Sequence, residues 1–368
     1  PVLAGFFLVA ALSSLALHQA GVPVTLAGGG PNPGFPGPYR RLVNLRRDFP
    51  LLRAALPWPR RYLLEQLSFL AGLRHLVSRL QPDVVHLCDP DLALQFVRRS
   101  PLGARRTVFK DGMLLGPHWC SRMPFVQVLA PFYRDVMAVG AGVDVSRWFV
   151  IPHLVDTDTY QPASDRRAER ASCRTPALPP EAFVVLGVGD FSTGGNKRLD
   201  WLVREVGSMP RSLGAHLVLV GQASPSQLAA FDEETRPVLG DRLHLLRSLP
   251  RQELPRLYRI ADVFAHAATR EPFGIVFLEA MASGLPLAGH PWEVTRWIVG
   301  DAGALVDMNA PGALRHLLED WASDPSRRHA LGAAARSRAV SQFSPRHLVP
   351  QYLAMYQSVR QSPPATSR

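Results

Sequence analysis

Residues 270–286 read Arg-Glu-Pro-Phe-Gly-Ile-Val-Phe-Leu-Glu-Ala-Met-Ala-Ser-Gly-Leu-Pro. Within this stretch, Ile275, Leu278 and Ala282 recur at positions i, i+3 and i+7, which is the spacing of one face of an α-helix. Gly284 follows at the place where helices commonly end in a left-handed cap. The stretch therefore predicts a loop, a short helix and a stop.

The residues ahead of this predicted helix favour the binding of an anion at the start of the helix. Pro272 lacks a backbone donor, which suits a helix start, and Gly274 leaves the N–H groups of the first turn unshielded by a side chain. Glu271 lies just before the first turn and Glu279 about two turns further on, at ~3.6 residues per turn. Two carboxylates then flank a helix end that attracts negative charge.

The motif Glu-Pro-Phe-Gly followed by Glu-Ala-Met-Ala-Ser-Gly-Leu-Pro resembles the donor-site motif of retaining GT-B glycosyltransferases, family 4, also called glycosyl transferases group 1. The resemblance implies an α/β fold of two doubly wound Rossmann-like domains facing across a cleft, with a C-terminal helix that crosses back to the first domain. It implies that Glu271 lies beside the donor sugar as a catalytic residue and that Glu279 binds the ribose hydroxyls. The alternative is an amphipathic helix that carries two acids without such a role.

The same resemblance implies a set of residues that hold the donor diphosphate. Backbone N–H groups near Phe273, Gly274 and Ile275 would bind phosphate at the positive helix end. Lys197, followed by Leu-Asp-Trp-Leu, matches the family's phosphate-binding lysine, and a flexible ammonium suits this task. A surface lysine without this role is the alternative. Besides the nucleotide-sugar donor, no cofactor and no metal is expected.

One position departs from the family's diphosphate site. The family has an arginine after the glycine of the turn at residues 189–198, and here Asp190 stands in its place. An acid would repel a diphosphate. Either Arg198 takes over the arginine's role, or Gly194 and Gly195 rearrange the loop.

A second departure lies in the first domain. Many family members carry a histidine near the reacting sugar, at the end of a strand that corresponds here to residues 105–109. This chain has Lys110-Asp111-Gly112 at that point. Two interpretations stand: Asp111 replaces the histidine as a catalytic residue, or the role is absent.

Length and composition favour two cytoplasmic domains. The chain has 368 residues, 47% of them hydrophobic and 19% charged, and single domains mostly run to ~100–200 residues. Its three cysteines form no CxxC pair, which argues against a disulfide framework or a zinc site and for a reducing compartment. The acid pairs Asp89/Asp91 and Asp156/Asp158 imitate a metal-binding Asp-x-Asp, but such pairs are common and no metal site is expected.

Pattern and resemblance together divide the chain as follows. We expect a buried helix over residues 1–17, a strand over 22–27, and a family first strand that is missing before the helix. Pro162–Pro180 is rich in Pro, Ala, Arg and Ser and is expected to be a linker. The predicted parts are an N-terminal acceptor-side domain (1–160), a C-terminal nucleotide-sugar-binding domain (161–345), a crossing helix (346–360) and a disordered tail (361–368).

The positive charge is concentrated in one segment. The net charge is +11, and Arg40–Arg79 carries nine arginines against Asp48 and Glu65. Aromatic and aliphatic residues interleave these arginines, a mixture typical of a peripheral membrane surface or of a site for a phosphate-bearing lipid acceptor. A solvated basic face is the alternative. No nucleic-acid-binding motif accompanies the charge, so nucleic acid is not an expected partner.

These features predict a retaining glycosyltransferase that moves a sugar from a nucleoside-diphosphate sugar to a glycan, lipid-linked or small-molecule hydroxyl acceptor. The expected location is the cytoplasm, with a peripheral position at the inner face of the membrane as a further expectation. A sugar epimerase or phosphorylase of the same fold is one alternative. A catalytically inactive nucleotide-sugar-binding or partner subunit is another, motivated by Asp190, the missing histidine and the missing first strand.

Overall fold

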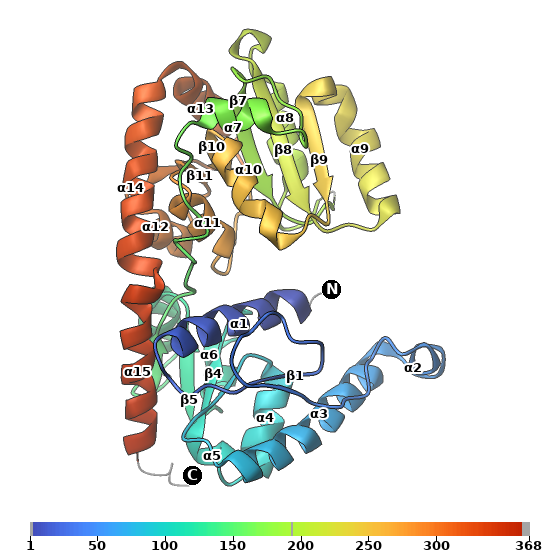
Figure 1. Ribbon diagram of the computed structural model, residues 1–368, viewed down its shortest axis with the longest axis vertical. Coiled ribbons are helices and arrows are strands. Elements are labelled where there is room, and N and C mark those ends of the chain that lie inside the picture. Colours follow the sequence, from blue (N-terminus) through green and yellow to red (C-terminus); the bar gives the residue numbers. More distant parts are fainter. Residues whose placement is uncertain (1–2, 193, 363–368) are drawn as a thin grey trace. The chain divides into compact units, whose positions relative to one another are not determined.

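The computed structural model describes residues 3–192 and 194–362 of the chain (Figure 1). It divides into two compact units, Pro1–Leu154 with Pro345–Arg368, and Val155–Ser344. The chain therefore passes into the second unit once and returns to the first for its last helix. The predicted junctions were at residues 160/161 and 345/346. Of the predicted disordered tail, residues 363–368 lie outside the described residues, and Gln361 is the last residue of a helix.

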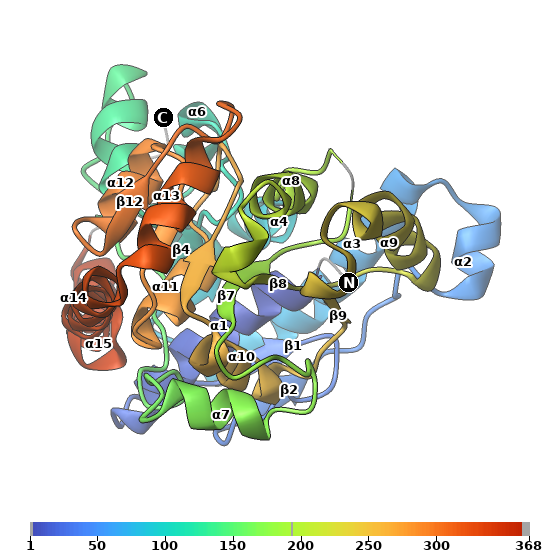
Figure 2. The same ribbon diagram turned by 90° about the horizontal axis from the view of Figure 1, so that it is seen from above.

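The second unit contains a parallel sheet, six-stranded among the described residues, in the order β12-β11-β10-β7-β8-β9. Both views place β9 at one end of this sheet, beside α9 (Figures 1 and 2). The strands are β7 (Phe183–Val188), β8 (Ala215–Gly221), β9 (Leu243–Arg247), β10 (Val263–Ala265), β11 (Leu287–Gly289) and β12 (Gly303–Leu305). The predicted doubly wound parallel sheet is confirmed. Apolar runs in the sequence predict strands over residues 183–188 and 215–221, and β7 and β8 have these bounds.

The helical segments of the second unit alternate with these strands. They are α7 (Arg166–Ser172), α8 (Leu199–Gly207), η2 (Arg211–Leu213), α9 (Pro225–Leu239), η3 (Gly240–Arg242), η4 (Arg251–Glu253), α10 (Leu254–Ile260), α11 (Ile275–Ala282), α12 (Glu293–Val299), α13 (Ala313–Ser323) and α14 (Pro325–Phe343). The apolar run at residues 298–307 predicts a buried strand, and this prediction is wrong at its start. Residues 298 and 299 complete α12, and Gly300, at φ +53°, ends that helix.

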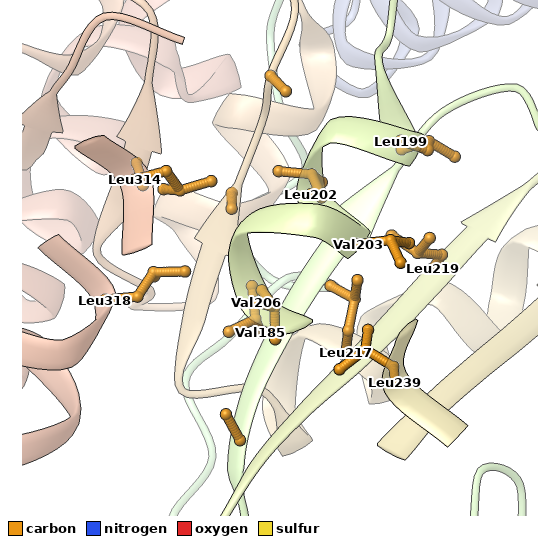
Figure 3. Packing of buried hydrophobic residues seen from close by; sticks show 14 of the residues in the cluster. Val185, Leu199, Leu202, Val203, Val206, Leu217, Leu219, Leu239, Leu314 and Leu318 are labelled. Atoms are coloured by element: carbon orange, nitrogen blue, oxygen red, sulfur yellow. The ribbon is translucent and has the colours of Figure 1, made fainter. Parts of the chain in front are cut away.

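The core of the second unit forms where α8 packs on the sheet (Figure 3). Leu199, Leu202, Val203 and Val206 recur at i, i+3, i+4 and i+7, so they share one face of α8, and each is buried. They meet buried side chains of β7 and β8, among them Val185. This packing fixes the turn between β7 and α8, on which Lys197 lies.

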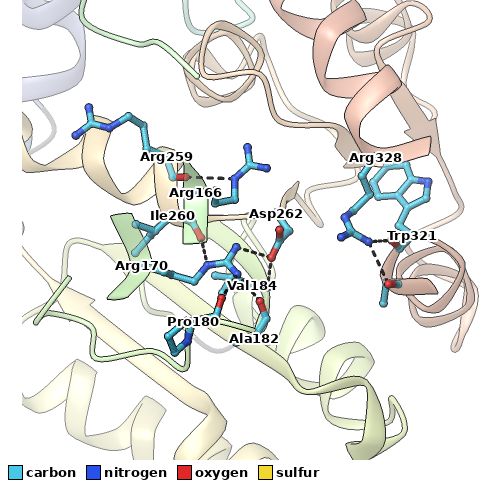
Figure 4. Close-up of polar contacts among 11 residues, drawn as sticks. Arg166, Arg170, Pro180, Ala182, Val184, Arg259, Ile260, Asp262, Trp321 and Arg328 are labelled. Atoms are coloured by element: carbon cyan, nitrogen blue, oxygen red, sulfur yellow. Dashed lines mark hydrogen bonds and ion pairs between the residues drawn. The ribbon is translucent and has the colours of Figure 1, made fainter. Parts of the chain in front are cut away.

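The predicted linker contains a docked helix, so that prediction is wrong. Helix α7 carries Arg170, whose side chain is buried with 5% of its surface exposed (Figure 4). Its guanidinium donates to Asp262 Oδ2 at 2.6 Å, to the Ala182 carbonyl at 2.6 Å and to the Ile260 carbonyl at 2.7 Å. The charge is satisfied from several sides, which is why a segment of linker-like composition is ordered here.

The first unit contains a second parallel sheet in the order β3-β4-β5-β6, and a separate parallel pair, β1-β2. The strands are β1 (Leu26–Gly28), β2 (Tyr39–Arg41), β3 (Val85–Leu87), β4 (Thr107–Lys110), β5 (Phe125–Val128) and β6 (Trp148–Val150). The predicted strand over residues 22–27 is thus shorter and begins four residues later.

Helices cover both sheets of the first unit. They are α1 (Leu3–Gln19), α2 (Pro50–Ala55), α3 (Trp58–Leu80), α4 (Pro90–Arg99), α5 (Gly103–Arg106), α6 (Pro117–Cys120), the π-helix η1 (Phe132–Ala138) and α15 (Pro345–Gln361). Ala16 and Leu17 of α1 are buried against Leu348 and Tyr352 of α15 in one apolar cluster. None of the helices within the described residues is long and apolar enough to cross a membrane.

Candidate functional site

Two of the predicted site residues of the second unit, Lys197 and Glu271, follow the carboxyl ends of two central strands. β7 and β10 are neighbours in the sheet. From β7 the chain continues to β8 and β9 on one side, whereas β10, β11 and β12 extend the sheet on the other. In such sheets, ligands bind at the carboxyl edge where the strand order reverses. Lys197 follows β7, and His266 and Glu271 follow β10, so all three come to this point.

A buried carboxylate joins these residues. Glu271 is 5% exposed, and its Oε2 accepts a hydrogen bond from Lys197 Nζ at 2.6 Å and lies 2.8 Å from His266 Nε2. Burial alone raises the pKa of a carboxyl group, but here the hydrogen bond and charge of His266, followed by the charge of Lys197, lower the pKa of Glu271 to about 2. Glu271 is therefore a carboxylate at neutral pH.

The predicted loop, helix and stop at residues 270–286 are confirmed. α11 begins after Gly274, which has φ +76°, and ends near Gly284, which has φ +69°. A Cβ atom at Gly274 would lie 2.7 Å from the Phe277 ring and 2.9 Å from the Cγ of Glu271. Both the left-handed backbone and the tight packing require glycine at this helix start.

The side chain of Phe273 belongs to the core. It is 2% exposed and packs near the rings of Trp297 and Phe343, at centroid distances of 6.3 and 6.5 Å. A ligand at this helix end would therefore meet the backbone of Phe273 and not its ring. Gly274 and Ile275 are partly exposed beside it.

Glu279 lies in a second buried polar cluster. It is 3% exposed, and its carboxylate accepts hydrogen bonds from Tyr160 Oη at 3.0 Å, Tyr258 Oη at 2.9 Å and Arg251 at 3.3 Å. Burial raises the pKa of Glu279, and the charge of Arg251 and the two tyrosine hydrogen bonds oppose that rise. The cluster holds the carboxylate in one orientation.

The structure thus adds four residues that the sequence did not single out: His266, Tyr160, Tyr258 and Arg251. The contacts to Glu279 join residues up to 119 positions apart, so no local sequence pattern predicts them. His266 is the exception, because it comes directly after a buried strand and five residues before Glu271. A histidine at the carboxyl end of a central strand is a signal that sequence reading can use.

Arg198 and Asp190 do not join the Glu271 cluster. Arg198 begins α8 with φ +49°, donates to Asn309 Oδ1 at 3.2 Å and stacks over the Trp201 ring at 4.7 Å. Asp190 is exposed. The idea that Arg198 compensates for Asp190 stays a prediction, since its guanidinium is directed to residues after β12 and on its own helix.

Asp111 lies in the first unit, after β4. Its carboxylate accepts from the backbone N–H groups of Met113 at 3.0 Å and Leu115 at 3.4 Å, and from Cys120 Sγ at 3.6 Å. Burial raises the pKa of Asp111, and the hydrogen bonds from this loop oppose the rise. These contacts give Asp111 a structural task in its own loop, and its catalytic role stays a prediction.

Among the residues that the structure describes, no group of three or more His, Cys, Asp or Glu side chains is placed to hold a metal ion. The expectation that the reaction needs no metal stays a prediction.

The fold defines the class to which the chain belongs. Two parallel-sheet units with a C-terminal helix returning to the first are also found in sucrose-phosphate synthase from Thermosynechococcus elongatus, at a TM-score of 0.75 and 20% identity over 95% of this chain and 92% of that one. The Anabaena protein HepE, solved with UDP and glucose, matches at a TM-score of 0.76 and 18% identity over 96% of each chain. The predicted GT-B fold is confirmed.

The sequence comparison then gives a family match within the second unit. Residues 174–338 match the family described as glycosyl transferases group 1, the family that the motif indicated. A relative from Kineococcus radiotolerans, named D-inositol 3-phosphate glycosyltransferase, is 33% identical over 217 residues, which cover 54% of this chain and 49% of the relative. The chain spans about half the length of the curated relatives it matches.

Proposed function

We propose that the chain is a retaining glycosyltransferase that takes its sugar from a nucleoside-diphosphate sugar, bound by the second unit. The observation that carries the proposal is the cluster of Lys197, His266 and Glu271 at the switch point of the sheet, beside the start of α11. A cation, an ionised carboxylate and a positive helix end are the groups that a sugar diphosphate needs.

In this proposal the diphosphate binds between Lys197 and the N–H groups of Gly274 and Ile275. The Lys197 side chain is 30% exposed, so its ammonium can reach a ligand while the buried Glu271 keeps it near the helix start. Charge-assisted hydrogen bonds to phosphate are roughly twice as strong as neutral ones. Lys197 and the positive end of α11 neutralise the charge of the leaving diphosphate without a metal or another cofactor.

The ionised state of Glu271 limits its catalytic role. With a pKa of about 2 it holds no proton at neutral pH, so it does not act as a general acid. We infer that it stabilises the positive charge that develops at the sugar carbon. Retention of configuration then follows by attack on the face that the diphosphate leaves, with the leaving diphosphate accepting the acceptor's proton.

We propose that Glu279 binds the ribose and that Tyr160, Tyr258 and Arg251 position it. Two of the relatives, from Kineococcus radiotolerans and Mycolicibacterium smegmatis, are named D-inositol 3-phosphate glycosyltransferase, which supports a hydroxyl acceptor of small-molecule, glycan or lipid-linked type. HepE was solved with UDP and glucose, which supports a uridine nucleotide as the first donor to test.

The segment Arg40–Arg79 supports a peripheral position at the inner, cytoplasmic face of a membrane. On α2 and α3, large apolar side chains are exposed to solvent: Leu51 by 72%, Trp58 by 55% and Leu63 by 48%. Nine arginines lie in the same segment. Apolar side chains that insert among lipids, next to cations that bind anionic headgroups, are typical of interfacial helices.

Vesicle sedimentation tests this surface. The chain is expected to sediment with vesicles containing anionic lipid at low salt and to be released as salt rises, because screening weakens the attraction. Leu51→Ser with Trp58→Ser should reduce binding. Arg98→Gln with Arg99→Gln, two exposed arginines on α4, is the matched control and should leave it unchanged. Equal binding to neutral and anionic vesicles contradicts the proposal.

The donor site is tested by thermal shift with UDP-, GDP- and ADP-sugars, followed by a product assay with the nucleotide that binds. A ligand at ~100 times its Kd adds ~2.7 kcal/mol of stability. Lys197→Ala should abolish the shift, Glu279→Gln should reduce it, and Arg204→Ala, whose side chain is 60% exposed on α8, should keep it. If no nucleotide sugar raises the melting temperature, the donor-site proposal is wrong.

A second candidate is an inactive nucleotide-sugar-binding subunit. The observation that favours it is the exposed acid Asp190 at the position where the family has a phosphate-binding arginine. This candidate predicts a thermal shift with a nucleotide sugar but no release of nucleoside diphosphate with any acceptor. The variant Asp190→Arg separates the two, because it should tighten binding in either case but raise turnover only in an enzyme.

A further inference from the structure

Two glycines allow helix α14 to pack closely against the end of α11 (Figure 1). A Cβ atom at Gly332 of α14 would overlap the carbonyl oxygen of Gly284, which follows α11, and a Cβ atom at Gly284 would lie 3.0 Å from Cγ of Pro162. Glycine at these positions therefore lets three segments meet: α14, the end of α11 and the loop that leads to Pro162. All three belong to the second unit.

Arg336 lies one turn further along α14 and joins the same segments. Its Nη1 lies 2.8 Å from the carbonyl oxygen of Ala282, 2.8 Å from that of Tyr160 and 3.0 Å from that of Thr157. Ala282 is the last residue of α11, whereas Thr157 and Tyr160 belong to the loop before α7. Because Nη1 carries only two hydrogens, the three carbonyl groups share them, and the positive charge strengthens each bond. Arg336 thus holds the loop against the end of α11.

The loop at residues 156–160 is otherwise closed on itself. Oδ1 of Asp156 accepts hydrogen bonds from the N–H groups of Asp158 and Thr159, both at 3.0 Å, and the N–H of Tyr160 donates to the Asp156 carbonyl at 3.0 Å. These bonds give the loop its shape, but bonds within the loop cannot fix its position relative to α11. That position depends on contacts such as those of Arg336.

The position of the loop decides where the Tyr160 hydroxyl lies. Tyr160 Oη donates to Oε1 of Glu279 at 3.0 Å, and Glu279 precedes Ala282 by three residues on α11. Arg336 therefore holds the backbone of Tyr160 and the helix that carries Glu279 at the same time. Without it, we expect the hydroxyl to move away from Oε1 and the carboxylate to turn.

We propose that Arg336 is a positioning residue for the sugar donor: by holding the Tyr160 loop against the end of α11, it sets the orientation in which Glu279 binds the ribose. The inference rests on the proposed ribose-binding role of Glu279. Arg336 acts through Tyr160 and not by contact with the nucleotide. Recognition of a ribose hydroxyl by a carboxylate needs a geometry held within about 0.5 Å, so a loosened loop should weaken it.

The same helix offers a matched control. Arg338 is half-buried like Arg336, and it also donates to carbonyl groups at a helix end: Nε to Ile298 at 2.8 Å, and Nη2 to Trp297. Both acceptors lie in the last turn of α12, on which none of the residues assigned to the ribose lies. Arg338→Met and Arg336→Met should both destabilise the chain, but only Arg336→Met should disturb Tyr160.

The test measures how well the full chain discriminates a ribose from a 2′-deoxyribose. Calorimetry gives the Kd of whichever of UDP, GDP and ADP binds wild type most tightly, and the Kd of its 2′-deoxy analogue. Wild type should prefer the ribonucleotide by about tenfold or more, the contribution of one hydrogen bond to a charged group. Arg336→Met should reduce this ratio to about threefold or less, and Arg338→Met should keep it. Effects on diphosphate binding cancel in the ratio, because both nucleotides carry the diphosphate.

Two further variants test the route through Tyr160. Arg336→Lys keeps a cation with three donors and should restore most of the ratio. Tyr160→Phe should lower the ratio, and adding Arg336→Met to it should then have little further effect, because the two residues act on one bond. If the Arg336→Met variant does not fold, Arg336→Gln replaces it, since its amide can still donate to one of the carbonyl groups.

The outcomes separate this inference from the proposed function. If wild type discriminates and the Arg336 variant discriminates equally well, Arg336 has only a structural role and the inference is wrong. Equal losses of discrimination in the Arg336 and Arg338 variants would indicate a general loosening of the unit and would also overturn it. If wild type binds the two nucleotides equally, or binds none, the role of Glu279 itself is wrong and the inference fails with it.

Discussion

Lys197 Nζ lies 2.6 Å from Oε2 of Glu271, although the two residues are 74 positions apart in the chain. The sequence assigns them different tasks, the lysine to the diphosphate and the glutamate to the sugar. In the structure they form one ion pair with His266 as a third member. The donor's diphosphate and its sugar are therefore expected to meet coupled groups, and changing one residue alters the other.

We expect Glu271→Gln to lower turnover more than binding. The amide keeps the shape of the side chain but removes the charge that stabilises the developing cation. Loss of one such electrostatic group typically costs about 10²–10³ in kcat. Steady-state kinetics with the donor found by thermal shift should show this loss in kcat, with a donor KM that changes by less than about threefold. A kcat within a factor of two of wild type contradicts the assignment.

The stability of the second unit should depend on the charge of Glu271. Its folded pKa of about 2 lies below its ordinary value of 4.5, so its contribution is fully present above pH 4.5 and is lost as the pH falls toward 2. The contribution of this charge to the free energy of unfolding is about 3–4 kcal/mol, at ~1.4 kcal/mol for each pH unit between 4.5 and 2. Urea unfolding of wild type and Glu271→Gln between pH 7 and pH 2.5 measures it.

We expect the free energy of unfolding of wild type to exceed that of Glu271→Gln by a constant amount from pH 7 to about 5. This difference in free energy should narrow below pH 4.5. Other carboxylates titrate in the same range, but they do so in both proteins and cancel in the difference. A gap that widens as the pH falls means that the folded pKa of Glu271 is raised, and the coupling to Lys197 and His266 is then wrong.

Tyr160 and Tyr258 should act on the nucleotide through Glu279. Each Tyr→Phe change removes one hydrogen bond from a buried carboxylate, at a cost of about 1–3 kcal/mol in stability. If the two tyrosines had a purely structural role, these changes would lower the free energy of unfolding and leave nucleotide recognition unchanged. The positioning role also predicts weaker discrimination between UDP and its 2′-deoxy analogue, measured by calorimetry. Glu279→Gln should remove that discrimination, and adding Tyr258→Phe to it should then have no further effect on it.

Local sequence patterns predicted those parts of the fold that depend on neighbours along the chain. The stripe of Ile275, Leu278 and Ala282 and the glycine at 284 placed α11, and continuous apolar runs placed β7 and β8 with correct bounds. The donors to Glu279 were missed because they come from α10, η4 and the loop at residue 160, which only the folded sheet brings together. The sequence identified both carboxylates and Lys197, but not His266 or the side chains that donate to Glu279.

The linker failed as a prediction for a related reason. Pro162–Pro180 has a loop-like composition, and nothing local distinguishes Arg170 from the other arginines of α7. What orders the helix is a set of distant carbonyl groups and the carboxylate of Asp262, 92 positions further on. Burial of a charged side chain depends on such tertiary partners, so composition alone predicts it poorly.

Two arginines on α7 allow this explanation to be tested within one helix. Arg170 is buried and donates to Asp262, whereas Arg167 pairs with Glu181 with both side chains about 70% exposed. Breaking a buried pair leaves an uncompensated charge and costs about 3–5 kcal/mol, while an exposed pair contributes about 0–1 kcal/mol. Arg170→Met should therefore lower the free energy of unfolding far more than Arg167→Met, as measured by urea denaturation of the full chain.

If the Arg170→Met variant does not fold, Asp262→Asn provides the milder comparison, since its amide oxygen still accepts from the N–H of Val184. Similar losses for the two arginine variants would show that α7 is held by its apolar contacts, and that the buried charge does not explain why this segment is a helix.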